Sequence, residues 1–127
     1  MKLLIDTQSF IWFIEDDAKL PSGICATMND VTSTLIVSIA SLWEMTIKMS
    51  LSKLKLSGNI ETMINRAIIA GFEILPIKSA HLMELSKLDF VHKDPFDRLI
   101  IAQAVSEHIS LISSDSVFKL YPVQWIW

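Results

Sequence analysis

In TLIVSIASLWEMTIKMS (residues 34–50), a short apolar run leads directly into a helical pattern. The run TLIVS has no polar residue between its two ends, which predicts a strand that is buried on both faces. The residues that follow place Ile39, Trp43 and Ile47 on one side of a helix. A buried strand that passes straight into a helix is typical of a parallel sheet, because parallel strands need a crossover connection.

The chain repeats this alternation from end to end. Apolar runs predict strands at residues 2–6, 34–38, 71–76 and 110–114, and a fifth if the apolar segment 123–127 is added. Helical patterns lie between them, at residues 7–15, 21–30, 38–50, 59–70, 78–88 and 95–108. These elements predict an α/β fold in one domain over residues 1–127, with a central parallel sheet of four to five strands and helices on both faces.

The composition limits the kinds of partner. With 11 basic and 14 acidic side chains, the net charge is −3. Such a chain has no overall attraction to nucleic acid, so any binding of RNA or DNA must depend on local patches or on metal ions. The hydrophobic fraction of 51% and the mean hydropathy of +0.44 are high for a chain of this size. They indicate either a well-filled core or a surface that is covered by a partner.

Three features of the sequence favour the cytoplasm. The single cysteine, Cys25, excludes an internal disulfide and suits a reducing compartment. Asp6 interrupts the first apolar run after three residues, so the start of the chain does not predict a signal peptide. No segment approaches the roughly 20 apolar residues that a membrane-spanning helix requires. We therefore expect a cytoplasmic protein that has no contact with a membrane.

Acidic residues follow the predicted strands. Asp6 ends the strand at 2–6, Asp115 follows the strand at 110–114, and Asp97 lies at the start of a long helix. In open α/β sheets, ligands bind outside the carboxyl ends of the strands. The sequence therefore predicts an acidic site at this edge of the sheet.

The segment HKDPFDRLIIAQA (residues 92–104) allows two interpretations of its acids. Asp94 followed by Pro95 is a common helix start, which favours a capping role for Asp94. Asp97, in the first turn, can also stabilise the helix by placing its negative charge near the positive end of the helix dipole. However, Asp97 lies on the same stripe as Ile100, Ile101, Ala104 and His108, and this stripe should face the core. A carboxylate directed inward needs a partner, and a metal ion is one of the few adequate ones.

Glu44 is ambiguous for another reason. It lies near Ser41 and Lys48 on the helical wheel, away from the apolar stripe of Trp43. Because Glu44 and Lys48 are four residues apart, periodicity favours a solvent-exposed ion pair. Asp6 and Asp115 have structural alternatives as well, a helix cap and a turn.

Several other kinds of site lack their patterns. His81, His92 and His108 are too scattered for a zinc site, and Cys25 has no companion at ligand spacing. The contiguous letters HKD at 92–94 lack the spaced pattern of phospholipase-type phosphodiesterases, so we interpret them as accidental. With three glycines the chain has no phosphate-binding glycine loop, and a G-x-S-x-G nucleophile motif is also absent.

Four motifs occur in an order that resembles a known family. LLIDT (3–7), VSIASLWEMTIK (37–48), HKDPFDRLIIAQA (92–104) and LISSD (111–115) resemble a PIN domain, and more narrowly the VapC-type toxins of toxin–antitoxin pairs. The resemblance runs from Lys2 to Trp127 and includes GFEILPI and the terminal Y-x-V-x-W-I-W. One departure is Gln8, where this subgroup often has histidine. The resemblance implies a single PIN-like domain.

The resemblance also implies a metal-dependent endoribonuclease, the toxin of a type II toxin–antitoxin system, which cleaves RNA phosphodiester bonds with a water activated by the metal. The residues that match the catalytic and metal-binding acids of the family are Asp6, Glu44, Asp97 and Asp115. Such oxygen ligands suit Mg²⁺ or Mn²⁺. Polar residues expected close to the site are Thr7, Ser38, Asp94 and Ser114. Basic residues that are candidates for gripping the RNA backbone are Lys48, Lys53, Lys55 and Arg98.

The expected partners are RNA, a cognate antitoxin and a second copy of the chain. In SFIWFIE (9–15), apolar side chains surround nearly the whole helix, which a helix packed on one side does not need. Phe10, Trp12 and Phe13 are therefore candidates for partner binding. The alternative is a helix buried on two sides within the domain or in a homodimer.

Two other functions compete with the nuclease. A PIN fold without catalytic activity would bind RNA or a partner, although the intact set of four acids argues against this. A phosphotransfer domain would use Asp6 as its acceptor. Such sites usually have a second acid one or two residues away, where this chain has Thr7 and Gln8.

Overall fold

The structure is a computed structural model that describes all residues from 1 to 127. Its centre is a five-stranded sheet in the order β3-β2-β1-β4-β5, and every neighbouring pair of strands is parallel. The strands are β1 (Lys2–Ile5), β2 (Thr34–Ser38), β3 (Glu73–Leu75), β4 (Ser110–Ile112) and β5 (Trp125–Ile126). The predicted parallel sheet is confirmed, and the segment near the C-terminus does supply a fifth strand.

Six α-helices cover the sheet. They are α1 (Thr7–Ile14), α2 (Ser22–Asn29), α3 (Ile39–Ser50), α4 (Ile60–Ile69), α5 (Ser79–Lys87) and α6 (Pro95–Glu107). Each corresponds to a helix predicted from the sequence, with ends that agree to within one residue. A short 3₁₀ helix at Ser116–Leu120 was not expected. No helix in the chain is long and apolar enough to cross a membrane.

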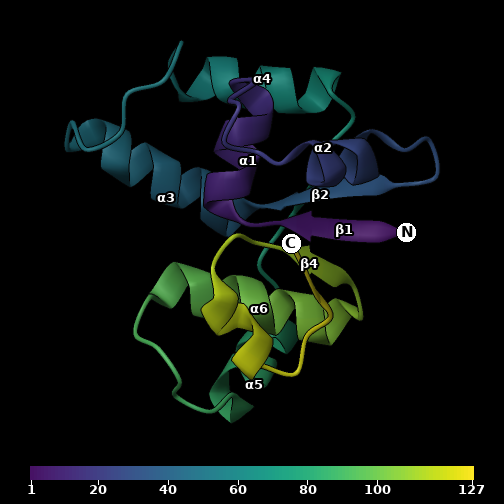
Figure 1. The fold of residues 1–127 in the computed structure, drawn as a ribbon. Coiled ribbons are helices and arrows are strands. Elements are labelled where there is room, and N and C mark those ends of the chain that lie inside the picture. Colours follow the sequence, from purple (N-terminus) through teal and green to yellow (C-terminus); the bar gives the residue numbers. More distant parts are fainter.

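The two faces of the sheet are buried by different helices. α1, α2, α3 and α4 lie on one side of the sheet, and α5 and α6 lie on the other (Figure 1). Successive side chains of a strand point to opposite faces, so Leu3 and Ile5 enter the core under the first group while Leu4 enters the core under α6. Because both faces are covered, the strands read as continuous apolar runs without polar alternation.

α6 is more deeply buried than a helix with a single apolar stripe. All seven residues from Arg98 to Ala104 are buried, because the helix packs against the sheet, α3 and α5. The expectation that the stripe faces the core holds for Ile100, Ile101 and Ala104. It is wrong for His108, which is exposed and ends the helix in the left-handed conformation (φ 55°).

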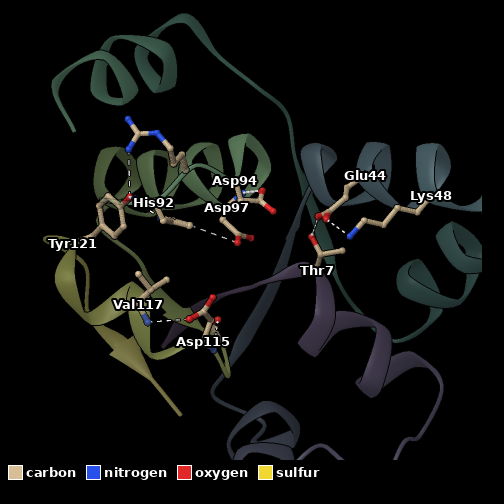
Figure 2. A network of polar contacts seen from close by, with 11 residues as sticks. Thr7, Glu44, Lys48, His92, Asp94, Asp97, Asp115, Val117 and Tyr121 are labelled. Carbon is tan, nitrogen blue, oxygen red and sulfur yellow. Dashed lines mark hydrogen bonds and ion pairs between the residues drawn. The ribbon is translucent and has the colours of Figure 1, made fainter. Parts of the chain in front are cut away.

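The connections bring the acids to one edge of the sheet. Asp6 directly follows β1, Asp115 follows β4 after two serines, and α3, which carries Glu44, begins immediately after β2. Because β1, β2 and β4 are parallel neighbours, their carboxyl ends meet at the same edge. The N-terminus of α6 reaches this edge from the other face and contributes Asp97 (Figure 2).

Candidate active site

An acidic pocket of about 360 Å³ lies at the carboxyl edge of the sheet. Its charged lining consists of Asp6, Glu44, Asp94, Asp97, Asp115, Lys48 and Lys53. Its remaining lining residues are Thr7, Gln8, Ile11, Leu54 and Ser114. The structure therefore brings the four acids predicted as ligands into one pocket, together with Asp94. Figure 2 shows Glu44, Asp94, Asp97 and Asp115 on the elements that supply them.

Asp6 is both a helix cap and part of the pocket wall. Its Oδ1 accepts a hydrogen bond from the Ser9 amide at 2.9 Å, which caps α1. The side chain is buried, with 6% of the residue exposed. Burial raises the pKa of Asp6 above its usual value, and hydrogen bonds from Ser9 and Ser113 offset part of that rise. The capping role expected from sequence is thus compatible with a place in the site.

Glu44 is held from two sides. Thr7 Oγ1 donates to Glu44 Oε1 at 2.7 Å, and Lys48 Nζ lies 2.8 Å from Glu44 Oε2. Ser41 Oγ lies 2.9 Å from Thr7 Oγ1, and since the single Thr7 proton is directed at Glu44, Ser41 is the donor in that contact. The ion pair with Lys48 that periodicity predicted is confirmed, but the prediction that Glu44 lies on a solvent-exposed face is wrong. The Glu44 side chain is only 7% exposed, because α1 packs against this side of α3.

Asp94 and Asp97 begin α6. The Asp97 amide donates to Asp94 Oδ1 at 3.0 Å, so the capping role of Asp94 is confirmed. Burial raises the pKa of Asp97 to about 7, and the negative charges of Asp94, Asp6, Glu44 and Asp115 add to the rise. Burial and the neighbouring negative charges together thus let Asp97 keep its proton near neutral pH, and a strongly raised pKa of this kind is typical of functional sites.

Asp115 closes the pocket on the β4 side. It caps the 3₁₀ helix through a bond from the Val117 amide to its Oδ1 (3.0 Å), and its own amide donates to Ser113 Oγ (3.0 Å). Ser113 is fully buried next to Asp6, whereas the expected neighbour, Ser114, is exposed and lines the pocket. Sequence reasoning missed Ser113, although strand alternation places the two serines of LISSD on opposite sides.

The donor set suits a hard divalent cation. No three acidic, histidine or cysteine side chains form a ready-made metal-binding group. Mg²⁺, however, keeps several of its waters and binds through one or two carboxylates together with substrate phosphate. Because the pocket offers carboxylate oxygens and no sulfur or imidazole ligand, its chemistry fits Mg²⁺ or Mn²⁺. The acids able to hold the ion are Asp6, Glu44, Asp97 and Asp115.

Comparison with protein-family models gives one match, the PIN domain, over residues 3–123. The chain belongs to the PIN domain family. No significant match was found among curated protein sequences. The family resemblance inferred from the four sequence motifs is therefore confirmed.

Solved structures of low sequence identity share this PIN fold. VapBC2 from Rickettsia felis, bound to a DNA fragment from its promoter, contains a chain with a TM-score of 0.76 and 18% identity, with coverage of 99% of this chain and 98% of that chain. DNA-bound VapBC from Salmonella typhimurium gives a TM-score of 0.71 at 18% identity, with coverage of 99% and 97%. VapBC-1 from nontypeable Haemophilus influenzae gives 0.69 at 18% identity, with the same coverage.

The basic residues of this PIN domain are divided between the pocket and other surroundings. Lys48 and Lys53 line the pocket, but Lys55 is exposed outside its lining. Arg98 is 9% exposed and is not among the lining residues, because its guanidinium binds the Asp89 carbonyl oxygen at 2.9 Å. Ser38 is also buried outside the pocket and caps α3 through the Ala40 amide.

The residues expected at a partner surface are divided in the same way. Trp12 and Phe13 line a groove of about 730 Å³ between α1 and α2. Phe10 instead lies in the core, fully buried, with its ring 5.1 Å from that of Phe72. Phe10 is therefore inaccessible to a partner in this structure, because the side of α1 that carries it packs against α3 and α4.

Proposed function

We propose that this PIN domain is an Mg²⁺- or Mn²⁺-dependent endoribonuclease and the toxin of a type II toxin–antitoxin pair. The observation that carries the proposal is the convergence of Asp6, Glu44, Asp97 and Asp115, from four separate parts of the chain, on one pocket. Membership of the PIN family and the similarity of the fold to chains of VapBC complexes support it.

The residues of the pocket have complementary roles in this proposal. Asp6, Glu44, Asp97 and Asp115 would hold the cation at the carboxyl edge of the sheet. When bound, a divalent ion activates a water for attack and neutralises the charge that develops on a cleaved phosphodiester. Thr7 orients Glu44 through their hydrogen bond of 2.7 Å. Without a cation the same acids would repel the RNA backbone.

Lys48 and Lys53 supply the positive charge at the rim. Lys48 lies beside Glu44, and its hydrogen bond to that carboxylate raises the pKa of the lysine, so it remains charged at neutral pH. With Lys53 it would bind phosphates of the RNA backbone next to the acids. In the absence of RNA, Lys48 reduces the repulsion between Glu44 and the neighbouring carboxylates.

The partner proposed for the groove between α1 and α2 is a cognate antitoxin. The similar solved structures are VapBC complexes. An amphipathic segment of the antitoxin would place apolar side chains against Trp12 and Phe13, as helices do in apolar grooves. We further propose that the toxin acts in the cytoplasm, on cellular RNA, as a homodimer.

The function is tested with purified, antitoxin-free protein and structured RNA. We expect cleavage with Mg²⁺ or Mn²⁺, loss of cleavage with EDTA, and recovery when the metal is returned in excess. Cleavage that is undiminished by EDTA would contradict the metal-dependent mechanism. RNA binding without cleavage at any metal concentration would instead support the alternative, a catalytically silent binding module.

A further inference from the structure

Tyr121 ties the segment before α6 to the start of that helix. Its hydroxyl oxygen accepts one hydrogen bond from the His92 backbone amide (3.2 Å) and another from Arg98 Nη1 (3.3 Å). The same oxygen lies 2.7 Å from His92 Nδ1. Figure 2 shows the ring of His92 between Tyr121 and Asp97, on the side of the pocket formed by α6.

These contacts determine which ring nitrogen of His92 carries its hydrogen. A hydroxyl oxygen has two lone pairs and one proton. The His92 amide and Arg98 can only donate, so they occupy both lone pairs of the Tyr121 oxygen. The Tyr121 proton is then directed at His92 Nδ1, which accepts it. The hydrogen-bond network therefore assigns the ring hydrogen of His92 to Nε2.

His92 Nε2 is directed at Asp97. This nitrogen is buried and has no hydrogen-bond partner. Asp97 Oδ2 lies 3.6 Å from it, just beyond hydrogen-bond distance. A buried N–H group without an acceptor is costly, and a small rotation of the Asp97 side chain would supply one. The backbone of Asp97 is already fixed, because its amide donates to Asp94 Oδ1.

We propose that His92 is a positioning residue for Asp97. Its Nε2–H holds Asp97 Oδ2 and so leaves the other carboxylate oxygen for a cation in the pocket. Groups that hydrogen-bond to a metal ligand in this way orient it and tune its affinity. The inference deepens the proposed function and rests on it, since it assigns a role at the same metal site.

The proposal also explains the position of Arg98. Its guanidinium carbon lies 4.6 Å from the centre of the Phe90 ring, and the group donates to the Asp89 carbonyl oxygen and to Tyr121. Arg98 thus holds the Tyr121 hydroxyl in the orientation that His92 requires. Arg98 makes these contacts outside the acidic pocket, so its guanidinium is not on the pocket lining where it was expected to bind RNA.

The first experiment compares two substitutions of His92 by calorimetric titration with Mn²⁺ at one pH. In His92→Gln, the amide nitrogen of the longer side chain can replace Nε2–H. In His92→Asn, the side chain ends near the position of Nδ1 and cannot reach Asp97. We expect a 10- to 100-fold loss of Mn²⁺ affinity for His92→Asn, roughly the range for groups that support metal ligands. His92→Gln should retain affinity within about threefold.

The second experiment uses the intact protein and does not depend on metal binding. Long-range ¹H–¹⁵N correlation spectra of metal-free protein should show the His92 hydrogen on Nε2, with the signal assigned by its loss in His92→Gln. In Tyr121→Phe, the Nδ1 acceptor loses its donor, so the preference for the Nε2–H form should decrease. A hydrogen on Nδ1 in the wild type would overturn the proposal.

The outcomes separate this inference from the proposed function. If the wild-type protein binds Mn²⁺ and cleaves RNA while His92→Asn binds Mn²⁺ equally well, the positioning role is overturned and the nuclease stands. An equal loss of affinity in His92→Gln and His92→Asn also overturns it, because loss of the imidazole itself would then account for the effect. If the wild-type protein neither binds Mn²⁺ nor cleaves RNA, the proposed function fails and the inference with it.

Discussion

Lys48 Nζ lies 2.8 Å from Glu44 Oε2, yet the two side chains have different surroundings: Lys48 is 49% exposed and Glu44 is 7% exposed. Lys48 therefore reaches the solvent at the rim of the acidic pocket, whereas Glu44 lies inside the pocket. The second carboxylate oxygen of Glu44 accepts from Thr7, which lies on α1. An ion pair that is visible in the sequence thus coexists with a position in the candidate active site.

The substitution Glu44→Gln separates these two roles. We expect RNA cleavage to be abolished, because the pocket loses a charged ligand, while stability changes by no more than about 1 kcal/mol. The amide oxygen of Gln can accept from Lys48 while its NH2 group donates to Thr7 Oγ1, which then donates to Ser41. Removal of one negative charge also relieves the repulsion within the pocket. Cleavage assays and thermal unfolding check this, and full activity in Glu44→Gln would return the residue to a purely structural role.

Asp97→Asn should stabilise the metal-free protein at neutral pH. The pKa of Asp97 is about 7 in the folded protein, whereas the usual pKa of an aspartate side chain in an unfolded chain is 3.8. Between these values the folded state binds more protons, so the contribution of Asp97 to stability falls as the pH rises. Asn cannot ionise, so the variant should gain about 1–2 kcal/mol at pH 7.5, after allowance for solvent screening and for the lost helix-dipole interaction.

The gain in stability of Asp97→Asn should depend on pH, and this dependence tests whether ionisation of Asp97 is its cause. Unfolding of Asp97→Asn and wild type in EDTA should give melting temperatures that differ at pH 7.5 and converge toward pH 4. Asp89→Asn, which changes an exposed acid just before α6, serves as the control and should show no such convergence. A variant that is less stable than wild type at pH 7.5 would refute the charge repulsion.

Asp94 can be tested for capping and charge separately. Asn caps a helix as well as Asp does and Ala does not, while both substitutions remove the same charge, so Asp94→Asn should be about 1 kcal/mol more stable than Asp94→Ala. Both variants remove one negative charge from the pocket, so both should weaken Mn²⁺ binding to the same extent. Denaturant unfolding and Mn²⁺ titration give the two readouts, and a large difference in metal affinity between the variants would contradict this division.

Trp12→Ala tests the groove between α1 and α2. Trp12 is partly buried and lines this groove, so its loss should weaken binding of the cognate antitoxin by at least about 2 kcal/mol, as for an aromatic hot spot. The control is Leu82→Ala, an exposed apolar residue of α5 on the other side of the sheet. Calorimetry with the antitoxin measures both, and unchanged affinity in a folded Trp12→Ala protein would move the partner site elsewhere.

The sequence by itself determined the elements and the edge of the sheet where the acids lie. Apolar runs such as TLIVS identify the parallel strands, because burial on both faces removes polar alternation. The capping positions of Asp6 and Asp94 depend on local backbone geometry, and both could be assigned from neighbouring residues. The order of the four motifs identified the PIN family, which the family model then confirmed.

Only the tertiary structure decided which neighbours cover each side chain. Periodicity placed Glu44 away from the apolar stripe of α3, but it contains no information that α1 would bring Thr7 against that side. The sequence assigned no structural role to His92 and suggested RNA binding for Arg98. The residue that joins the two is Tyr121, which lies more than 20 residues away in the chain. Burial of a polar group depends on long-range packing, and a local pattern in the sequence cannot specify the partner that packing supplies.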